Sequence, residues 1–361
     1  MKKIMTVIGT RPELIRLSRI LPKLDRYYDH VVVHTGQNYT PELHHQFFDD
    51  LEIRTPDYQL NMEHTVFGIQ FIANTLVETE KILQKENPDA VLILGDTNSA
   101  VSAYVCHQRG IPVFHMEAGN RCYDRSVPEE LNRRIVDTCS SFLLTYTQRS
   151  REHLLNEGYH PASVIVTGNP IKEVIDHYTE VKADPFESIS GQYKLHAEKY
   201  FLATIHRTEN ITNQQRLEGI IEGLNSVSDS GLKILLSMHP KLKTMLSKFE
   251  IGLSENIVQC EPFSFTEFLA LMKRAVGVLS DSGTVPEECA ILGIPCILIR
   301  TSTERPELLE TNSMILSGVR KEEIISSINI ARELPVGAPP ADYLDVDVSD
   351  KIVKILSRHI N

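Results

Sequence analysis

Short apolar segments rich in β-branched residues alternate with amphipathic segments along the whole chain. Apolar runs of four to eight residues between turn residues predict buried strands, and apolar residues spaced three or four apart predict helices. In the first half the predicted strands are Ile4–Gly9, His30–Thr35, Ala90–Gly95, Pro112–Glu117, Phe142–Thr147 and Val164–Gly168. The helices predicted between them include Pro12–Asp25, Thr65–Lys85, Thr97–Arg109, Pro128–Cys139 and Arg149–Asn156. This alternation is typical of a parallel sheet covered on both faces.

The pattern is interrupted at residues 178–199, a polar stretch that contains Pro185 and Gly191, and then resumes. The second half has predicted strands at Tyr200–Ile205, Lys233–Met238, Asn256–Gln259, Val276–Ser280 and Pro295–Arg300, each followed by a helical pattern. A second break at Pro335–Pro340 precedes a last amphipathic helix, Ser349–His359. The pattern therefore predicts an α/β chain with two successive doubly wound units.

Polar residues follow many of the predicted strands at their carboxyl ends, where ligands of such sheets bind. They are Gly9-Thr10-Arg11, Thr35-Gly36-Gln37, Gly95-Asp96-Thr97, Glu117-Ala118-Gly119, Thr204-Ile205-His206-Arg207, His239-Pro240 and Asp281-Ser282-Gly283-Thr284. A single one of these segments could be only a turn. Seven of them favour a ligand site at the strand ends.

The amino-acid composition argues against two classes of binding partner, nucleic acids and membranes. The chain has 361 residues, enough for two domains, and a formal net charge of −11, which argues against a broad basic face for nucleic acid. No apolar run approaches the ~20 residues of a membrane span. The six cysteines lack CxxC pairing and metal-ligand spacing, and several lie in apolar runs, so we expect reduced thiols and a cytoplasmic location.

Two segments have the chemistry to bind an anion. Ser282, Gly283 and Thr284 precede a helical pattern, where free N–H groups would face a diphosphate, and Gly9–Pro12 forms a similar turn carrying Arg11. An ordinary helix cap with a glycine turn explains either segment equally well. No GxGxxG follows a predicted strand and no GxxxxGK[ST] occurs, so dinucleotide and P-loop sites are unsupported.

Carboxylates could gather at one side of the first sheet. Asp96 and Glu117 end two predicted strands, and Glu129 and Glu130 begin a helix. Neighbouring carboxylates raise one another's pKa, which suits general acid–base chemistry. The alternatives are a helix cap for Asp96 and helix-dipole partners for the two glutamates. No spaced set of His, Cys, Asp and Glu predicts a metal site.

Taken together, these segments resemble the non-hydrolysing UDP-N-acetylglucosamine 2-epimerase family from Val7 to about Gly318. The matching motifs of the first half are GTRPE (9–13), HTGQN (34–38), GDTNS (95–99), HMEAGNR (115–121), PEELNRR (128–134) and TGNP (167–170). The second half adds HRTEN (206–210), SDSGTVPEE (280–288) and ERPE (304–307). HMEAGNR and VPEELNRR look most like the branch that forms UDP-N-acetyl-L-fucosamine for capsule or O-antigen.

The resemblance implies two Rossmann-like domains facing across a cleft, as in GT-B glycosyltransferases. Residues 1–180 would form the domain with the catalytic carboxylates and residues 181–345 the UDP-binding domain. Residues 346–361 would form a helix that packs back on the first domain. The family needs no added cofactor, and its members are commonly homodimers. Its reaction eliminates UDP in the anti sense to a 2-acetamidoglycal and adds it back after C2 is protonated from the opposite face.

The resemblance also assigns roles residue by residue. The catalytic set falls on Asp96, Glu117, Glu129 and His206. Asp96 and Glu117 would transfer protons at C2, and His206 would assist the departing phosphate. Glu129 would stabilise the cation or orient a partner. The residues expected to bind the UDP-linked substrate are Arg11, Arg16, Gln37, Arg133, His239, Phe268, Ser282, Gly283, Thr284, Glu288 and Arg305.

Two departures from the family pattern matter. Arg16 stands where the family has a lysine and keeps the charge. Asn38 stands where the bacterial UDP-GlcNAc branch often has a histidine, in a region that contacts an activating second UDP-GlcNAc, which argues against such allostery here.

The expected activity is C2 epimerisation of a UDP-N-acetylhexosamine of the UDP-GlcNAc/UDP-ManNAc type. The alternative substrate is UDP-2-acetamido-2,6-dideoxy-L-talose, with the same chemistry. Further alternatives are a hydrolysing 2-epimerase, a GT-B glycosyltransferase and a catalytically silent nucleotide-sugar sensor.

Overall fold

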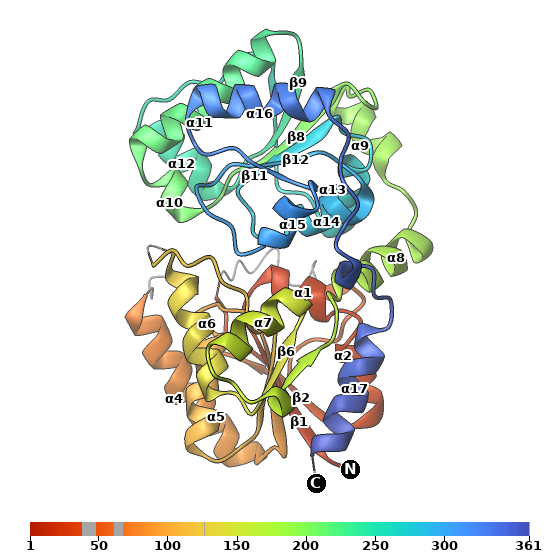
Figure 1. Cartoon of the computed structure of the whole chain (residues 1–361). Helices are drawn as coiled ribbons and strands as arrows, with labels where there is room; N and C mark the ends of the chain where they lie inside the picture. Colours follow the sequence, from red (N-terminus) through yellow and green to blue (C-terminus); the bar gives the residue numbers. More distant parts are fainter. Residues whose placement is uncertain (38–47, 61–67, 126, 361) are drawn as a thin grey trace. The chain divides into compact units, whose positions relative to one another are not determined.

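The computed structural model describes residues 1–37, 48–60, 68–125 and 127–360 (Figure 1). The chain divides into two compact units, each with its own sheet. Unit 1 comprises Met1–Val174 with Asp342–Asn361, and unit 2 comprises Ile175–Ala341. The domain boundaries expected from the sequence, after residues 180 and 345, stay predictions.

Unit 1 is built on a seven-stranded parallel sheet with the strand order β3-β2-β1-β4-β5-β6-β7. Its strands are β1 (Lys3–Ile8), β2 (Asp29–His34), β3 (Tyr58–Gln59), β4 (Ala90–Leu94), β5 (Val113–Met116), β6 (Phe142–Thr145) and β7 (Val164–Val166). The chain winds outward in one direction from β1 and in the other from β4. The strand order therefore reverses between β1 and β4.

The helices of unit 1 cover this sheet. They are α1 (Arg11–Leu17), α2 (Leu21–Tyr27), α4 (Ile69–Glu86), α5 (Ala103–Gln108), α6 (Pro128–Cys139), α7 (Gln148–Asn156) and α17 (Val348–His359), with 3₁₀ turns η1 (Ala100–Ser102), η2 (Pro161–Ser163) and η3 (Ala341–Tyr343). Alternate residues of β1 and β4, such as Met5 and Ile93, pack against apolar residues of α4, α5 and α6 such as Ile82 and Val136. Burial of this apolar face is the main favourable contribution to folding of the unit.

Two helices differ from the sequence prediction. The segment Pro12–Asp25, expected as one helix, forms α1 and α2, because Pro22 has no N–H to donate to the carbonyl of Ser18 and its ring would clash there. Residues 97–99 of the expected helix Thr97–Arg109 lie outside any helix, and there the side chain of Thr97 bonds to Glu13 of α1 and that of Ser99 to Gln37. Residues 65–67 of the expected helix Thr65–Lys85 lie outside the described residues.

Unit 2 repeats the same architecture with six parallel strands in the order β10-β9-β8-β11-β12-β13. Its strands are β8 (Tyr200–Thr204), β9 (Lys233–Ser237), β10 (Ile257–Cys260), β11 (Gly277–Ser280), β12 (Cys296–Leu298) and β13 (Ile315–Leu316). Its helices are α9 (Phe186–Tyr193), α10 (Thr208–Ile211), α11 (Gln214–Asp229), α12 (Pro240–Lys248), α13 (Phe265–Met272), α14 (Val285–Leu292), α15 (Pro306–Glu310) and α16 (Lys321–Glu333). The strand order reverses between β8 and β11. The two sheets confirm the prediction of two doubly wound α/β units.

The polar stretch 178–199 is not a bare linker. Helix α8 (Ile171–Val181) runs from unit 1 into this stretch, and α9 follows within it. At the other end of the chain, α17 belongs to unit 1 and packs on α2. The Tyr28 hydroxyl donates to the carbonyl of Val353, and Lys23 pairs with Asp350.

Within the described parts of the chain, the helices are too short or too polar to cross a bilayer. The same residues contain no group of three His, Cys, Asp or Glu side chains arranged to hold a metal ion. The six cysteines are free thiols, and five of them are buried.

Candidate active site

The strand order locates one candidate site in each unit. Open parallel sheets bind ligands outside the carboxyl ends of the strands, at the point where the strand order reverses. In unit 1 this point is flanked by the segments after β1 and β4, which carry Arg11 and Asp96. In unit 2 it is flanked by the segments after β8 and β11, which carry His206 and Ser282.

Asp96 and Glu117 lie close together in unit 1. A Cβ atom added to Gly95, the residue before Asp96, would lie 3.8 Å from Oε2 of Glu117. Glu117 has a φ of 67°, a left-handed conformation that is costly for a glutamate. Such strain is held in place by surrounding contacts and is often found at functional positions. The Glu117 carboxylate thus lies against the backbone of Gly95, next in the chain to Asp96, the other residue that sequence reasoning singled out for proton transfer.

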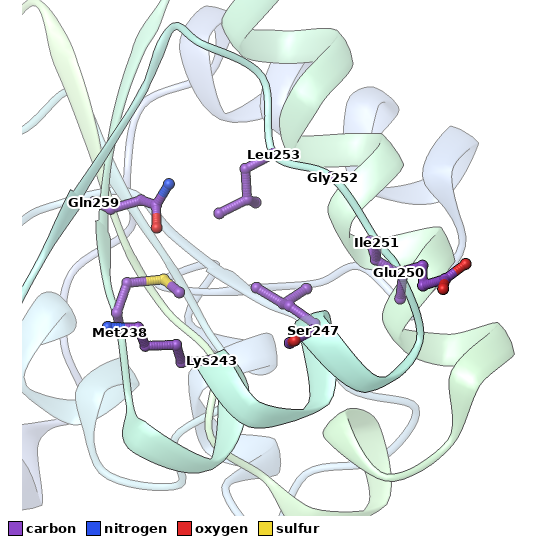
Figure 2. Close-up of a pocket in the computed structure, with 9 residues that line it drawn as sticks. Met238, Lys243, Ser247, Glu250, Ile251, Gly252, Leu253 and Gln259 are labelled. Carbon is purple, nitrogen blue, oxygen red and sulfur yellow. The ribbon is translucent and has the colours of Figure 1, made fainter.

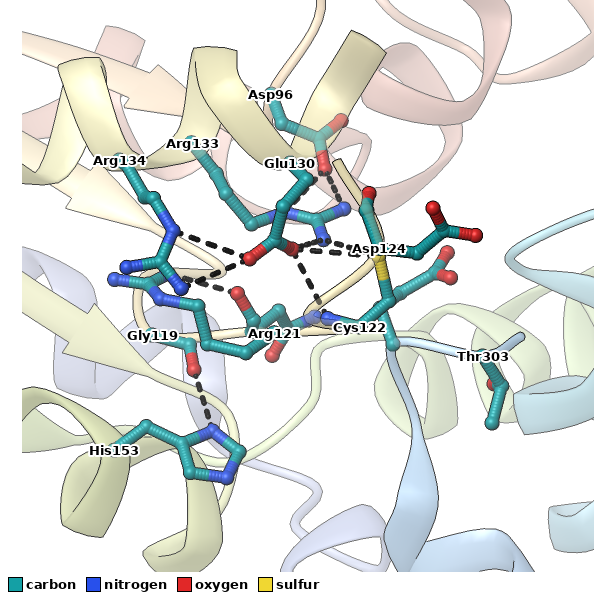
Figure 3. Close-up of polar contacts among 12 residues, drawn as sticks. Asp96, Gly119, Arg121, Cys122, Asp124, Glu130, Arg133, Arg134, His153 and Thr303 are labelled. Atoms are coloured by element: carbon teal, nitrogen blue, oxygen red, sulfur yellow. Dashed lines mark hydrogen bonds and ion pairs between the residues drawn. The ribbon is translucent and has the colours of Figure 1, made fainter. Parts of the chain in front are cut away.

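The Asp96 carboxylate is held by Arg133 of α6 (Figure 3). Nε and Nη2 of Arg133 both donate to Oδ2 of Asp96, the former at 3.0 Å, while Nη1 donates to Glu130 at 3.0 Å. The backbone carbonyl of Asp96 accepts a bond from the Asn132 side chain. Arg133, which was expected among the residues that bind the UDP-linked substrate, therefore contacts two carboxylates through its three guanidinium nitrogens.

The Glu117 carboxylate has partners of its own. Nη1 of Arg16 donates to Oε2 at 3.0 Å, and the side-chain amide of Asn120 donates to Oε1 at 3.2 Å. Arg16 and Glu117 are both buried, and the Arg16 guanidinium also lies 5.7 Å from the centre of the Tyr146 ring. Arg16 was expected among the substrate-binding residues, and the structure places it against a catalytic candidate.

Two neighbouring glutamates begin α6 and differ in environment. Glu130 is buried and accepts bonds from the Cys122 backbone N–H, Arg133 and Arg134 (Figure 3). Burial opposes its ionisation, but these donors hold the pKa of Glu130 below its usual value. Glu129, the residue assigned by the resemblance, is only half-buried in the first turn of the helix. Glu130 is thus a structural anion that anchors Arg133.

Gln37 and Arg11 border the same part of unit 1. Oε1 of Gln37 accepts bonds from both the backbone N–H and the hydroxyl of Ser99. Arg11 is the first residue of α1 and is half-buried. Asn38, the neighbour of Gln37 on which the expectation about allostery depends, lies outside the described residues.

The first turn after β1 contains a buried carboxyl group that sequence reasoning missed. Oε2 of the buried Glu13 accepts the backbone N–H groups of Gly9 and Thr10, and its Oε1 accepts the Thr97 hydroxyl at 2.7 Å. The turn expected to offer N–H groups to a phosphate therefore gives two of them to a side chain of its own helix. Its motif, GTRPE, contained Glu13, but only the capping geometry identifies this role.

We predict that the charge of Glu13 makes stability depend on pH. Burial raises the pKa of Glu13 from 4.5 to about 7, although Thr97 and the two N–H groups oppose the shift. The contribution of this group to stability is complete below about pH 4.5 and is lost as the pH rises through 7. The total loss is about 3 kcal/mol. The Glu13→Gln variant has no proton to lose at this position. Measured by urea unfolding, its free energy of unfolding should fall by about 3 kcal/mol less than that of the wild type between about pH 4.5 and 7.

The exposed Glu152 on α7 provides the control for this experiment. The Glu152→Gln variant should follow the wild type at every pH. A Glu13→Gln variant that also follows the wild type would refute the prediction.

In unit 2 a buried aspartate organises the site. Asp281 accepts the backbone N–H groups of His206 and Arg207 and the side-chain amide of Asn210. Nδ1 of His206 lies 3.3 Å from its Oδ1, and the side chain of His206 is 41% exposed. Asp281 thus joins the ends of β8 and β11 and fixes one side of a histidine whose ring reaches solvent. Sequence reasoning had placed Asp281 in an anion-binding segment without this function.

The loop after β11 is tightly bonded within itself. The backbone N–H of Ser282 donates to the Ser280 hydroxyl, and that of Thr284 donates to the Ser282 hydroxyl. The hydroxyls of Ser282 and Thr284 lie 3.2 Å apart. A phosphate bound by these N–H groups, as the sequence suggested, would have to replace the internal bonds. Helix α14 starts directly after this loop, and its Glu288 is buried.

Gly283 lies against a charged cluster in unit 2. A Cβ atom on Gly283 would lie 2.5 Å from Oε1 of Glu304 and 3.2 Å from Nη2 of Arg207, so a larger residue here would require these charged side chains to shift. Arg305, a predicted UDP ligand, is buried and pairs with Glu287 and Glu304. The structure thus brings Gly283, Arg305 and Arg207 together.

His239 and Phe268, expected on the uridine side, lie on different helices. His239 is the N-cap of α12, where its Nδ1 accepts the Lys241 N–H, and its ring centre lies 6.4 Å from that of His206. Burial and the neighbouring His206 and Lys241 charges lower the pKa of His239. Phe268 is a half-buried residue of α13. The structure thus places His239 beside His206, and the position of Phe268 on the uridine side stays a prediction.

A pocket of about 380 Å³ in unit 2 lies elsewhere (Figure 2). It is lined by residues of α12, the following loop and the neighbouring strands, among them Met238, Lys243, Leu253 and Gln259. None of the residues predicted to bind substrate lines it.

Comparisons with known proteins agree with this architecture. The profile of the UDP-N-acetylglucosamine 2-epimerase family matches residues 23–357. A UDP-N-acetylglucosamine 2-epimerase of Methanocaldococcus jannaschii is 38% identical over 91% of this chain and 92% of its own length. A Pseudomonas aeruginosa protein, named UDP-2,3-diacetamido-2,3-dideoxy-D-glucuronate 2-epimerase, is 31% identical over 90% of this chain and 91% of its own.

A solved structure of this family is similar to the chain over its whole length. The M. jannaschii UDP-GlcNAc 2-epimerase in complex with UDP-GlcNAc and UDP superimposes with a TM-score of 0.92 at 35% identity, and 99% of each chain is covered. The match therefore includes both units and the elements that carry the predicted site residues. The chain belongs to the UDP-N-acetylglucosamine 2-epimerase family.

Proposed function

We propose that this epimerase inverts C2 of a UDP-linked N-acetylhexosamine and interconverts UDP-GlcNAc and UDP-ManNAc. The observation that carries the proposal is the pair of carboxylates that follow the neighbouring strands β4 and β5 of unit 1. Asp96 and Glu117 adjoin Gly95, and each is bonded to an arginine of its own. The M. jannaschii relative that binds UDP-GlcNAc and UDP supports this choice of substrate.

The chemistry requires two stages. The C2 proton of such a sugar is not adjacent to a carbonyl, so cleavage of the C1–O bond must lead and develop positive charge at C1. Anti elimination then releases UDP and leaves a 2-acetamidoglycal, and addition of UDP with protonation of the opposite face completes the inversion. Carboxylates stabilise the positive charge and transfer the proton at C2.

Unit 1 has the groups for the proton transfers. Asp96 and Glu117 are the proposed proton-transfer groups at C2, and Glu129 is the proposed stabiliser of the cation. Arg133 has every nitrogen directed to a carboxylate, so we propose that it positions Asp96 rather than the diphosphate. Arg11, at the beginning of α1, and Gln37 remain proposed contacts to the substrate.

Unit 2 has the groups for the nucleotide. His206, oriented by Asp281 and partly exposed, is suited to assist the departing phosphate. Ser282, Gly283, Thr284 and Arg305 would bind the diphosphate; Glu288 would accept from the ribose hydroxyls, and His239 and Phe268 would line the uracil side. These roles follow from the family resemblance and from position.

The alternative substrate is UDP-2-acetamido-2,6-dideoxy-L-talose. The motifs HMEAGNR and VPEELNRR favour it, because they look most like the branch that produces UDP-N-acetyl-L-fucosamine. The reaction and the roles of the residues would be unchanged. A cytoplasmic location and a homodimer are proposed from the sequence and the family.

Proton NMR in D₂O tests the function directly. Purified protein with UDP-GlcNAc should lose the C2 proton signal and develop the anomeric signal of UDP-ManNAc. No exchange with UDP-GlcNAc, together with exchange of UDP-2-acetamido-2,6-dideoxy-L-talose, would transfer the assignment to the 6-deoxy-L series. Free UDP accumulating with turnover would instead identify a hydrolysing enzyme, and binding without exchange of either sugar would refute epimerisation.

A further inference from the structure

His115 is a buried histidine with hydrogen bonds at both ring nitrogens. It lies on β5, two residues before Glu117, and is inaccessible to solvent. Its Nδ1 is 2.8 Å from Oδ1 of Asp137 on α6, and its Nε2 is 2.9 Å from the backbone carbonyl of Gly95. His115 was noticed in the sequence only as the first residue of a motif, and no role was assigned to it.

Both partners of the ring are acceptors. A backbone carbonyl can only accept a hydrogen bond, and so can an ionised carboxylate. Asp137 is inaccessible to solvent and also accepts a bond from Nη2 of Arg121 at 2.7 Å. Burial opposes ionisation of Asp137, but Arg121 pairs with it and the backbone N–H of Gly119 also donates to its Oδ2 at 3.4 Å, and these two donors favour the ionised carboxylate independently of His115. The ring must therefore donate from both nitrogens, and only the imidazolium ion does so.

His30 shows that this requirement is specific to His115. His30 is also a buried histidine on a strand of unit 1, and its Nδ1 also contacts an aspartate, Asp25, at 2.7 Å. Its Nε2, however, lies 2.9 Å from the Thr6 hydroxyl, which can donate as well as accept. A neutral ring can therefore make both hydrogen bonds of His30, whereas it cannot make both hydrogen bonds of His115.

The bond to Gly95 connects His115 to the catalytic candidates. The Gly95 carbonyl belongs to the peptide group that joins Gly95 to Asp96. Gly95 has a φ of 76°, so the chain leaves the extended conformation of β4 at this point. The peptide group is fixed by the bond from His115, and the Asp96 carboxylate by the bonds from Arg133. Both donors depend on α6, because Arg133 belongs to it and His115 pairs with its Asp137.

We propose that His115 is a permanently protonated positioning residue that orients the Gly95–Asp96 peptide through a charge-assisted hydrogen bond. The charged groups around it are Asp137 of α6, which contacts the ring, and Arg121, which contacts Asp137. Its other ring nitrogen contacts the backbone carbonyl of Gly95, directly after β4. The effect on catalysis rests on the proposed role of Asp96, whereas the protonation state does not.

The protonation state can be measured without reference to activity. The full chain, labelled with ¹⁵N in its histidine rings, is examined by NMR at pH 8, where an ordinary histidine is neutral. His115, assigned by the signals lost in His115→Gln, should have both ring nitrogens protonated. In Asp137→Asn, the amide can donate to Nδ1, so the ring should become neutral while Nε2–H still bonds to Gly95. A neutral His115 ring in the wild type would overturn the proposal.

Kinetics then separate positioning from charge. Asp137→Asn, which keeps the bond to Gly95, should lower kcat about tenfold with little change in KM. His115→Asn, which is too short to make both bonds, should lower kcat about a hundredfold. His30→Asn is the matched control: it alters a buried histidine–aspartate pair outside the site and should leave kcat within about twofold. An equal fall in kcat for His30→Asn and His115→Asn would overturn the positioning role.

The two readouts distinguish failure of this inference from failure of the proposed function. A wild-type chain without epimerase activity, but with a doubly protonated His115, would refute the function and keep the protonation state. An active chain with a neutral His115 would support the function and refute the protonation state.

Discussion

Asp96→Asn and Glu117→Gln will each abolish inversion at C2, with kcat lower by about 10²–10⁴, the usual contribution of a positioned acid or base. Both replacements keep the size of the side chain and a polar oxygen, so the bonds from Arg133 and Arg16 retain an acceptor. UDP affinity should change by less than about threefold, because neither residue is proposed to contact the nucleotide. Turnover is followed by the anomeric proton signals and UDP binding by calorimetry.

Isotope exchange assigns each carboxylate to one face of C2. If the two groups act on opposite faces, a variant that lacks one of them can still remove and return the proton of one epimer. One variant should then exchange C2 only in UDP-GlcNAc and the other only in UDP-ManNAc, and neither should interconvert them. Exchange by one variant in both epimers would remove its altered residue from proton transfer.

Asp89→Asn is the matched control for Asp96→Asn. Asp89 directly precedes β4, whereas Asp96 follows it, so the two aspartates lie at opposite ends of one strand. Asp89 bonds to the Lys3 backbone N–H and to Lys2, away from the candidate site. Its replacement should leave kcat unchanged. A similar loss of turnover in Asp89→Asn would mean that general destabilisation explains the result at Asp96.

The strands of both sheets could be predicted from the sequence because apolar runs in parallel sheets are continuous and bounded by turn residues. Each predicted strand ends within two residues of the observed one. The two-residue strands β3 and β13 were missed, since so short a segment has no pattern to detect. The break between α1 and α2 had a visible cause, Pro22, but amphipathic spacing on both sides suggested one helix.

The candidate site was predictable only in part. Asp96 and Glu117 could be proposed because they follow strands that the fold makes neighbours. The hydrogen-bond partners of these residues could not be predicted, because they depend on which side chains are buried and on where those side chains point. Glu130 and Glu129 are adjacent in sequence, yet only the former is buried against Arg133. His115 lies within a strand, where a histidine is more often a core residue, and only the Asp137 and Gly95 contacts reveal its state.

Arg16→Met will remove most of the activity and also destabilise unit 1. Arg16 and Glu117 form an ion pair of 3.0 Å in which both side chains are less than a tenth exposed. Loss of one partner of a buried pair leaves the other charge without compensation and costs about 3–5 kcal/mol. The uncompensated Glu117 will favour its neutral form, which cannot act as a base. Urea unfolding and the turnover assay in D₂O measure the two effects.

Two further variants separate the charge from the packing. Arg16→Lys retains a positive charge, as in the family members that have lysine here, and should keep activity within about tenfold although lysine lacks the planar guanidinium. The double variant Arg16→Met/Glu117→Gln removes both charges and should regain about 2 kcal/mol or more of the stability lost in Arg16→Met, while remaining inactive. Strictly additive losses of stability in the double variant would show that the pair is not coupled. A fully active Arg16→Met would show that Glu117 does not need this arginine for catalysis.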